Sequence, residues 1–154
     1  MEFNQKNEES TTLPNLMILI CMTLLSIVQG AAAEETYSII IHATNPTASL
    51  SSAEVMNMFL GKKVSWDDGK KIEIVTLKDS AIHQEFLKDY VKKTPQQFLC
   101  YWRQMLFAGK GAIPKTCDSE AEAVDFISKT PGSIGYVSAA SSSAPGVKGI
   151  QINP

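Results

Sequence analysis

A short polar run, Lys78-Asp79-Ser80, lies where an apolar strand gives way to an amphipathic helix. Amides at the start of a helix lack carbonyl partners within the helix and carry partial positive charge, so they suit an anion. Lys78 would add a charge and Ser80 a hydroxyl donor, while Asp79 would accept the proton of a protonated oxyanion. The run predicts a site for a small oxyanion, and a plain helix cap at Asp79-Ser80 is the alternative.

His83 follows one turn into the same helix and completes the candidate binding site. It contributes only if that side of the helix faces the site, and the sequence alone favours a solvent-exposed position for it. The other histidine, His42, falls within an apolar strand and is predicted to be a sheet residue and not a ligand.

Two further segments contain residue types that occur in functional loops. Trp66-Asp67-Asp68 fits a hinge or contact loop, or simply a turn. Gly109-Lys110-Gly111 lacks the full Walker pattern and is expected only to end a helix. The sequence contains no G-x-S-x-G motif, no CxxC motif and only two histidines. We therefore predict a protein that is not an enzyme and holds no metal and no cofactor.

Strands that alternate with helices must position these residues. The start of a helix is marked at Ser51 by a capping box with Glu54, and at Thr94 by the following Pro95. Trp102 falls on the apolar stripe of the second of these helices and is expected to be buried. The pattern predicts an α/β fold in three layers, with a mostly parallel sheet flanked by helices. Strands are expected at 37–43, 71–77, 113–117, 134–137 and 149–152, and helices at 51–60, 80–91, 94–108 and from 118 or 119 to the turn at 130–132.

The N-terminal segment resembles an export signal. Residues 16–28 form an apolar run that is short for a membrane-spanning helix, and Ala31-Ala32-Ala33 supplies the small residues of a signal peptidase site. We expect cleavage after Ala33, so that residues 1–33 are a signal peptide and 34–154 one domain. Residues 1–15 carry three glutamates and one lysine, which is unusual for a signal peptide and leaves two alternatives, a start further downstream or an uncleaved anchor.

Charge and cysteine content narrow the class of partner. The full chain has 14 basic and 16 acidic residues, and loss of residues 1–33 leaves 13 of each. This balance gives no support for binding to nucleic acid or to a membrane surface. Cys100 and Cys117 remain after cleavage, and an oxidising compartment permits a disulfide between them.

Five segments together resemble the phosphate-type substrate-binding proteins of ABC transporters. They occur in the order of that family and cover nearly the whole of 34–154. The resemblance implies one lobe of a type 2 periplasmic-binding-protein fold and a periplasmic location. It also implies phosphate or a similar small oxyanion as ligand and a membrane transporter or sensor as partner. The segments are SSAEVMNMFLGKKVSW (51–66), IEIVTLKDS (72–80), Tyr101-Trp102 followed by FAGKG (107–111), DSEAEAV (118–124) and TPGSIGYV (130–137).

The candidate site departs from the pattern of that family. The family's turn reads like R-A-D-G-S-G-T and contacts phosphate through Arg, Asp, Ser and backbone amides. Here Asp79 matches the family's Asp, Ser80 matches its Ser with a shift of one residue, and Leu77 occupies the Arg position beside Lys78. The glycines that let amides approach an anion are absent. Binding is therefore expected to be weak, and a single lobe offers only half a cleft, so tight binding would need a partner lobe or a homodimer. The alternative function is a ligand-free periplasmic interaction or signalling scaffold.

We predict that export removes the N-terminal segment. Sequencing the N-terminus of protein isolated from the periplasm should give a chain that begins at or near Glu34, because the triplet ending at Ala33 is the cleavage pattern. Full-length protein recovered only from membranes would show instead that the segment is an anchor.

Overall fold

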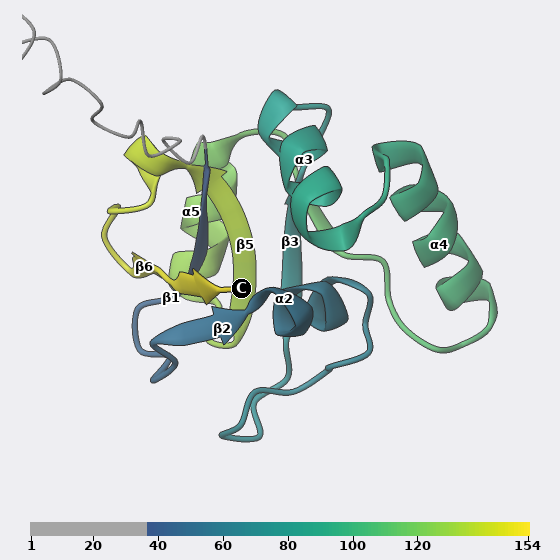
Figure 1. The fold of residues 1–154 in the computed structure, drawn as a ribbon. Helices are drawn as coiled ribbons and strands as arrows, with labels where there is room; N and C mark the ends of the chain where they lie inside the picture. The colour runs from purple at the N-terminus through teal and green to yellow at the C-terminus, as the bar shows by residue number, and fades with distance from the viewer. Residues whose placement is uncertain (1–36) are drawn as a thin grey trace, which may run out of the picture. The chain divides into compact units, whose positions relative to one another are not determined.

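The alternating pattern produces a five-stranded sheet in the computed structural model, which describes residues 37–154 (Figure 1). The strands lie in the order β4 (Lys115–Cys117), β3 (Glu73–Leu77), β5 (Ser133–Ser138), β1 (Tyr37–His42) and β6 (Val147–Gly149). β1 pairs antiparallel with β5 and β6, while β3 pairs in parallel with β4 and β5. Four of the five strands therefore run in one direction, as predicted.

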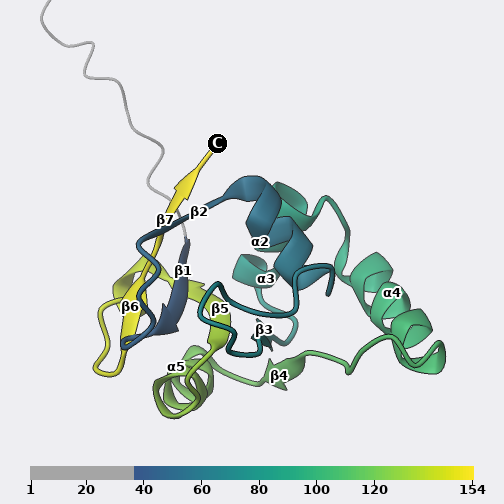
Figure 2. The same cartoon turned by 90° about the horizontal axis from the view of Figure 1, so that it is seen from below.

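Helices cover both faces of the sheet (Figure 2). α5 (Glu120–Lys129) packs on one face, and α2 (Ser52–Phe59) and α3 (Ala81–Phe86) lie on the other. The chain runs from α3 into a π-helical turn, η1 (Leu87–Val91), and then into α4 (Pro95–Phe107). The predicted three-layer α/β class is confirmed, but the helix predicted at 80–91 keeps α-helical bonding only as far as Phe86.

A second, two-stranded sheet was not predicted. β2 (Ser49–Ser51) pairs in parallel with β7 (Gln151–Asn153). The single strand expected at 149–152 is instead divided at Ile150, whose amide donates to the carbonyl of Ile39 at 3.0 Å. β2 is too short to show hydrophobic periodicity, and its pairing with β7 joins segments far apart in the sequence, so local patterns did not reveal this sheet.

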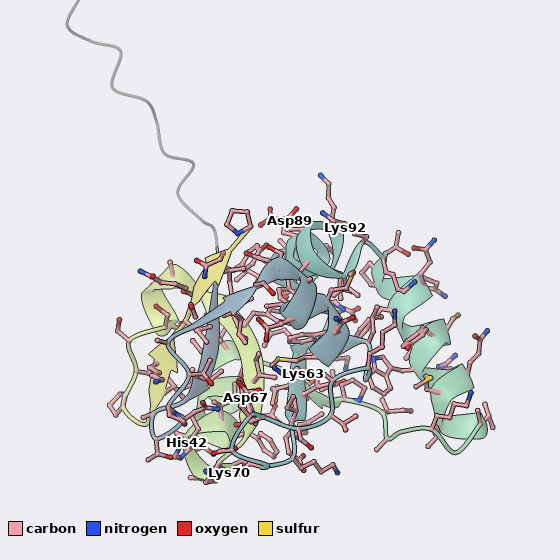
Figure 3. The ribbon with its side chains drawn as sticks, turned by 60° about the horizontal axis from the view of Figure 1, so that its bottom comes forward. His42, Lys63, Asp67, Lys70, Asp89 and Lys92 are labelled. Atoms are coloured by element: carbon pink, nitrogen blue, oxygen red, sulfur yellow. The ribbon has the colours of Figure 1, made fainter. Side chains whose placement is uncertain are left out.

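Polar side chains begin the helices where the sequence predicted. Ser51, Ser80, Thr94 and Ser119 each accept a hydrogen bond from the amide three residues further on. At Ser51 the box is complete, since Glu54 accepts from the Ser51 amide at 3.0 Å. That hydrogen bond, followed by the one from Lys63, lowers the pKa of Glu54 to about 2. Lys63 also contacts Asp67 at 3.3 Å and so ties the following loop to α2 (Figure 3).

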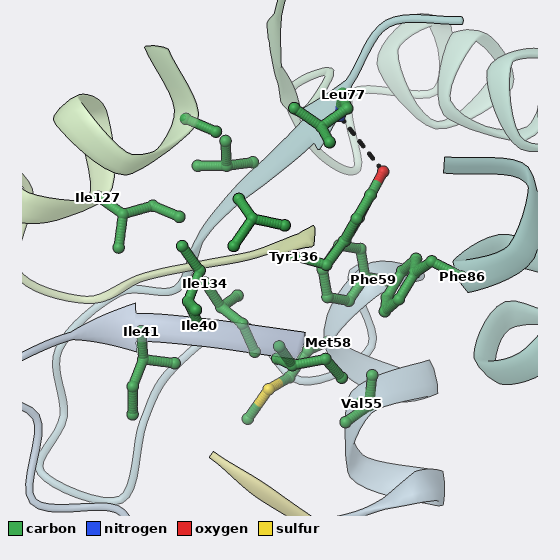
Figure 4. Close-up of a cluster of buried hydrophobic side chains, with 14 of the residues drawn as sticks. Ile40, Ile41, Val55, Met58, Phe59, Leu77, Phe86, Ile127, Ile134 and Tyr136 are labelled. Carbon is green, nitrogen blue, oxygen red and sulfur yellow. Dashed lines mark hydrogen bonds between the residues drawn. The ribbon is translucent and has the colours of Figure 1, made fainter. Parts of the chain in front are cut away.

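Aromatic rings from three elements meet in the core. Tyr136 of β5 stacks on Phe86 of α3, with 4.0 Å between ring centroids, and Phe59 of α2 packs against both (Figure 4). All three side chains are almost fully buried. Stacked and tilted aromatic contacts of this kind add to the free energy gained by burial alone, so this cluster joins the sheet to its helices.

α4 lies to one side of the sheet (Figure 1), and two of its side chains form hydrogen bonds with the end of α2. Trp102 donates from Nε1 to the carbonyl of Phe59 at 3.2 Å, and Tyr101 donates to that of Leu60 at 2.7 Å. Gly61 has φ +66°, and a Cβ there would lie 2.8 Å from the Trp102 ring, so both backbone and space require glycine. The prediction that Trp102 is buried is confirmed. Truncating a buried aromatic residue of this kind costs about 3–5 kcal/mol of folding free energy.

Other predictions have mixed outcomes. Trp66 is part of a turn, but its ring is buried and donates from Nε1 to the Gly132 carbonyl at 2.7 Å, which anchors the loop. The disulfide is not formed, since Cys100 is exposed, Cys117 is buried and both thiols are free. The signal segment 1–33, with its cut after Ala33, lies outside the described residues. Within residues 37–154, no helix is both long and apolar enough to cross a membrane.

Candidate oxyanion-binding cavity

The predicted turn lies beside a cavity of about 290 Å³. β3 and β4 are parallel and end at the same edge of the sheet, where the Lys78 amide donates to the Cys117 carbonyl at 2.9 Å. Ligands of α/β sheets bind beyond the carboxyl ends of parallel strands, which is where this cavity opens. Lys78, Asp79 and His83 line it together with residues that the sequence did not single out as binding residues, namely Thr76, Leu77, Pro95, Gln96, Phe98, Leu99, Trp102, Ile113, Pro114 and Thr116.

Ser80 is not among the lining residues. Its hydroxyl oxygen caps α3 by accepting a hydrogen bond from the His83 amide at 3.0 Å. α3 itself has only six α-helical residues before the π-helical turn. The π-helical turn continues the helical segment to Val91, close to the predicted end, so the aligned peptide dipoles extend over 81–91.

Asp79 makes the bend between β3 and α3. Its backbone is left-handed, with φ 43°, a conformation that Asp tolerates better than most non-glycine residues. The side chain is exposed and the residue lines the cavity. Its carboxylate is thus in water and available to a ligand.

Lys78 is exposed and forms an ion pair with Asp118, with 3.4 Å between Nζ and Oδ1. The Lys78 side chain is 61% exposed and that of Asp118 is 81% exposed. Exposed pairs of this kind contribute little to stability, because water and salt screen them. Lys78 can therefore leave Asp118 for a bound anion at small cost.

His83 is buried, and the expectation of a solvent-exposed position was wrong. Only 8% of the residue is accessible, and its Nδ1 lies 2.5 Å from the hydroxyl of Tyr136. The two rings also stack, with an angle of 16° between their planes. The partner is 53 residues away in the sequence, so no local pattern around His83 could have predicted this contact.

The tautomer of His83 follows from the hydrogen bonds of Tyr136. The Leu77 amide donates to the Tyr136 hydroxyl at 3.3 Å (Figure 4), so the hydroxyl proton needs a separate acceptor. His83 Nδ1 is the acceptor within reach, which leaves the ring proton on Nε2. Burial raises the pKa of Tyr136, which keeps the hydroxyl proton on its oxygen. Burial also lowers the pKa of His83, which keeps the imidazole ring neutral. The negative charge of Asp79 opposes this lowering of the His83 pKa.

The Nε2–H group of His83 is accessible. Among residues 37–154, no side-chain nitrogen or oxygen atom is both fully buried and without a hydrogen-bond partner. Nε2 has no protein partner there, so it must reach solvent, and the side chain lines the cavity. The Tyr136 bond thus leaves a neutral N–H donor on a residue that lines the cavity, as Lys78 also does.

Comparison with known proteins supports the fold. No family model matches the sequence, and no curated protein matches it. An ABC-type phosphate transport receptor from Vibrio cholerae superposes with a TM-score of 0.59 at 17% identity, over 76% of this chain and 46% of that one. PstS from Borrelia burgdorferi superposes with a TM-score of 0.59 at 19% identity, over 77% of this chain and 47% of that one. A phosphate binding protein from Stenotrophomonas maltophilia superposes with a TM-score of 0.54 at 16% identity, over 76% of this chain and 39% of that one.

These similarities establish the fold of one lobe of phosphate-binding proteins. The chain spans less than half the length of each of these three structures. At such identities the likeness shows the fold alone, because one fold can support many different sites.

We predict that His83 makes stability depend on pH. Its pKa is lowered on folding, so the unfolded chain binds the proton more readily. The free energy of unfolding should fall as pH drops from about 6.5 towards the lower pKa of the folded protein, by at most about 1.4 kcal/mol per pH unit. Urea denaturation at several pH values between about pH 5 and pH 8, a range that brackets the usual pKa of histidine, measures how steeply the free energy of unfolding depends on pH.

His83→Gln should flatten this slope, because Gln retains an acceptor for Tyr136 but does not titrate. His42→Gln removes the chain's other histidine and is the matched control, in which the slope should remain. If the parent and His83→Gln have equal slopes, the assignment of the slope to His83 is wrong.

Proposed function

We propose that this chain is an exported solute-binding module that weakly holds a small oxyanion, phosphate or a close relative, in the cavity beside Lys78, Asp79 and His83. The observation that carries the proposal is the hydrogen bond between His83 and Tyr136 beside the cavity, from which we infer that His83 offers an Nε2–H donor to the ligand. Lys78 adds a positive charge on the same wall. A neutral donor and a cation together suit an anionic oxygen, since charge-assisted hydrogen bonds are the stronger kind.

Asp79 gives the proposed site its selectivity. Its carboxylate accepts a hydrogen bond from the hydroxyl group of a protonated oxyanion such as hydrogen phosphate, but it repels a fully ionised anion such as sulfate. Lys78 and Asp79 cancel in charge on the cavity wall, so discrimination depends on whether the anion carries a proton to donate.

Weak binding follows from two features of the chain. The glycines of the family's turn are absent, and Ser80 and Ile82 stand at their positions, where a side chain hinders the approach of amides to a ligand. The chain also spans less than half the length of the phosphate-binding proteins with which it shares a fold, so it offers one lobe of a two-lobed cleft. We infer affinity no better than micromolar, about −8 kcal/mol or weaker.

The compartment and the partner belong to the same proposal. Residues 1–33 direct the chain across the inner membrane and are removed, so the domain acts in the periplasm. There it delivers its solute, or the signal that solute is present, to a membrane transporter or sensor. A second copy of the chain is a candidate for the missing wall of the site.

We predict that calorimetry will detect phosphate binding but not sulfate binding. Lys78→Ala should weaken phosphate binding at least tenfold, because the mutation removes the cation of the site. Asp79→Ala should let sulfate bind, because the repelling carboxylate is gone. Ser80→Ala tests whether the hydroxyl of Ser80 reaches the ligand or only caps α3.

Lys129→Ala is the matched control. Lys129 forms an exposed ion pair with Asp125, as Lys78 does with Asp118, but it lies on α5 and does not line the cavity. Its loss should leave phosphate affinity unchanged. Absence of heat with millimolar phosphate would favour a scaffold without a ligand, and phosphate affinity unaffected by Lys78→Ala would place the anion elsewhere.

A further inference from the structure

The cavity has two chemically different sides. Lys78, Asp79 and His83 supply charge and hydrogen bonds at the end of β3. The side formed by α4 and the segment that follows it is mostly apolar, with Gln96 as its one polar member beside Pro95, Phe98, Leu99, Trp102, Ile113 and Pro114. A ligand that fills this space meets a polar side and an apolar side at once.

Part of the apolar side is exposed to water. Leu99 is 40% exposed and Ile113 is 45% exposed, although both line the cavity. Phe98 and Trp102 beside them are buried. Covering Leu99 and Ile113 removes apolar surface from water, and only a ligand with apolar surface of its own gains free energy by doing so.

Inorganic phosphate leaves this side of the cavity unused. The cavity of about 290 Å³ has room for roughly ten water molecules, and a bare tetrahedral oxyanion, which has only five non-hydrogen atoms, fills only part of it. Its oxygens would also face Leu99 and Ile113, which offer no hydrogen bonds, and a polar group that loses water without a replacement partner is destabilised. The volume and the lining both favour a ligand with a second, apolar part.

We propose that the preferred ligand is an organic phosphate monoester or phosphonate, with its acidic head at Lys78 and His83 and a compact apolar group against Leu99 and Ile113. This rests on the proposed oxyanion site and adds the class of molecule that carries the oxyanion. The bridging atom of such a head still leaves three terminal oxygens. The second pKa of a phosphate monoester is about 6, so most molecules carry the proton that Asp79 needs only below about pH 6, and the ligands are compared there.

Calorimetry with phenyl phosphate and inorganic phosphate tests the proposal, because the two ligands share a head and differ in the apolar group. Phenyl phosphate should bind at least tenfold tighter than phosphate to the parent protein. Phenol alone should bind at least tenfold more weakly than phenyl phosphate, since it lacks the acidic head.

Leu99→Asn should cut the preference for phenyl phosphate to less than threefold, and it should not weaken phosphate binding, because Asn removes apolar surface and offers hydrogen bonds to an oxyanion. Leu106→Asn is the matched control, because Leu106 lies on the same helix, is 46% exposed and does not line the cavity. Its preference should equal that of the parent. Circular dichroism and thermal unfolding check that both variants remain folded.

Equal affinity for phosphate and phenyl phosphate would overturn this inference while the proposed oxyanion site stands. The same would follow if Leu106→Asn lowered the preference as much as Leu99→Asn, or if phenol bound as tightly as phenyl phosphate. Absence of binding by both phosphate and phenyl phosphate would overturn the proposed function and this inference together.

Discussion

The Tyr136 hydroxyl connects the interior of the domain to the candidate site. It accepts from the Leu77 amide of β3 and pairs with His83 of α3, while its ring stacks on Phe86. A buried hydroxyl without partners costs about 1–3 kcal/mol, so these contacts constrain one another. If His83 gained a second proton, Nδ1 would become a donor and the hydroxyl would lose its acceptor. The same bond that satisfies the core therefore sets which nitrogen of His83 offers a proton to the cavity.

A second constraint gives the cavity its other wall. α4 is joined to α2 through Trp102 and Tyr101, whose side chains donate to the carbonyls of Phe59 and Leu60 at the end of α2. These carbonyls would otherwise lack partners at a helix C-terminus. Phe98 and Trp102 of α4 are buried, and both line the cavity, together with residues at the ends of β3 and β4. Trp102 thus serves both the C-terminus of α2 and the wall of the cavity.

Local rules predicted most of the fold, and long-range contacts decided most of the site. The helix starts at Ser51 and Thr94 were predictable because each side chain bonds an amide three residues away. The buried positions of His83 and Trp66 were not, since their partners Tyr136 and Gly132 lie 53 and 66 residues away. The IGYV segment (134–137) predicted a strand, but the sequence pattern of a strand does not show which helix will contact Tyr136. Lys78 and Asp79 were predicted to lie at the end of a strand, and both line the cavity. The apolar side of the cavity was not predicted, because Phe98 and Trp102 also fit the apolar stripe of a helix that packs on the hydrophobic core.

The central claim is that Tyr136 holds His83 as the Nε2–H tautomer facing the ligand. Nitrogen NMR of the His83 ring tests it most directly, because a protonated and an unprotonated ring nitrogen give well-separated signals. The account predicts a proton on Nε2 and none on Nδ1 at neutral pH, and a shift of the Nε2 signal when phosphate is added. It also predicts that Tyr136→Phe, which removes the hydroxyl, lets the two tautomers mix. A proton on Nδ1 in the parent protein, or an Nε2 signal that saturating phosphate leaves unmoved, would contradict the account.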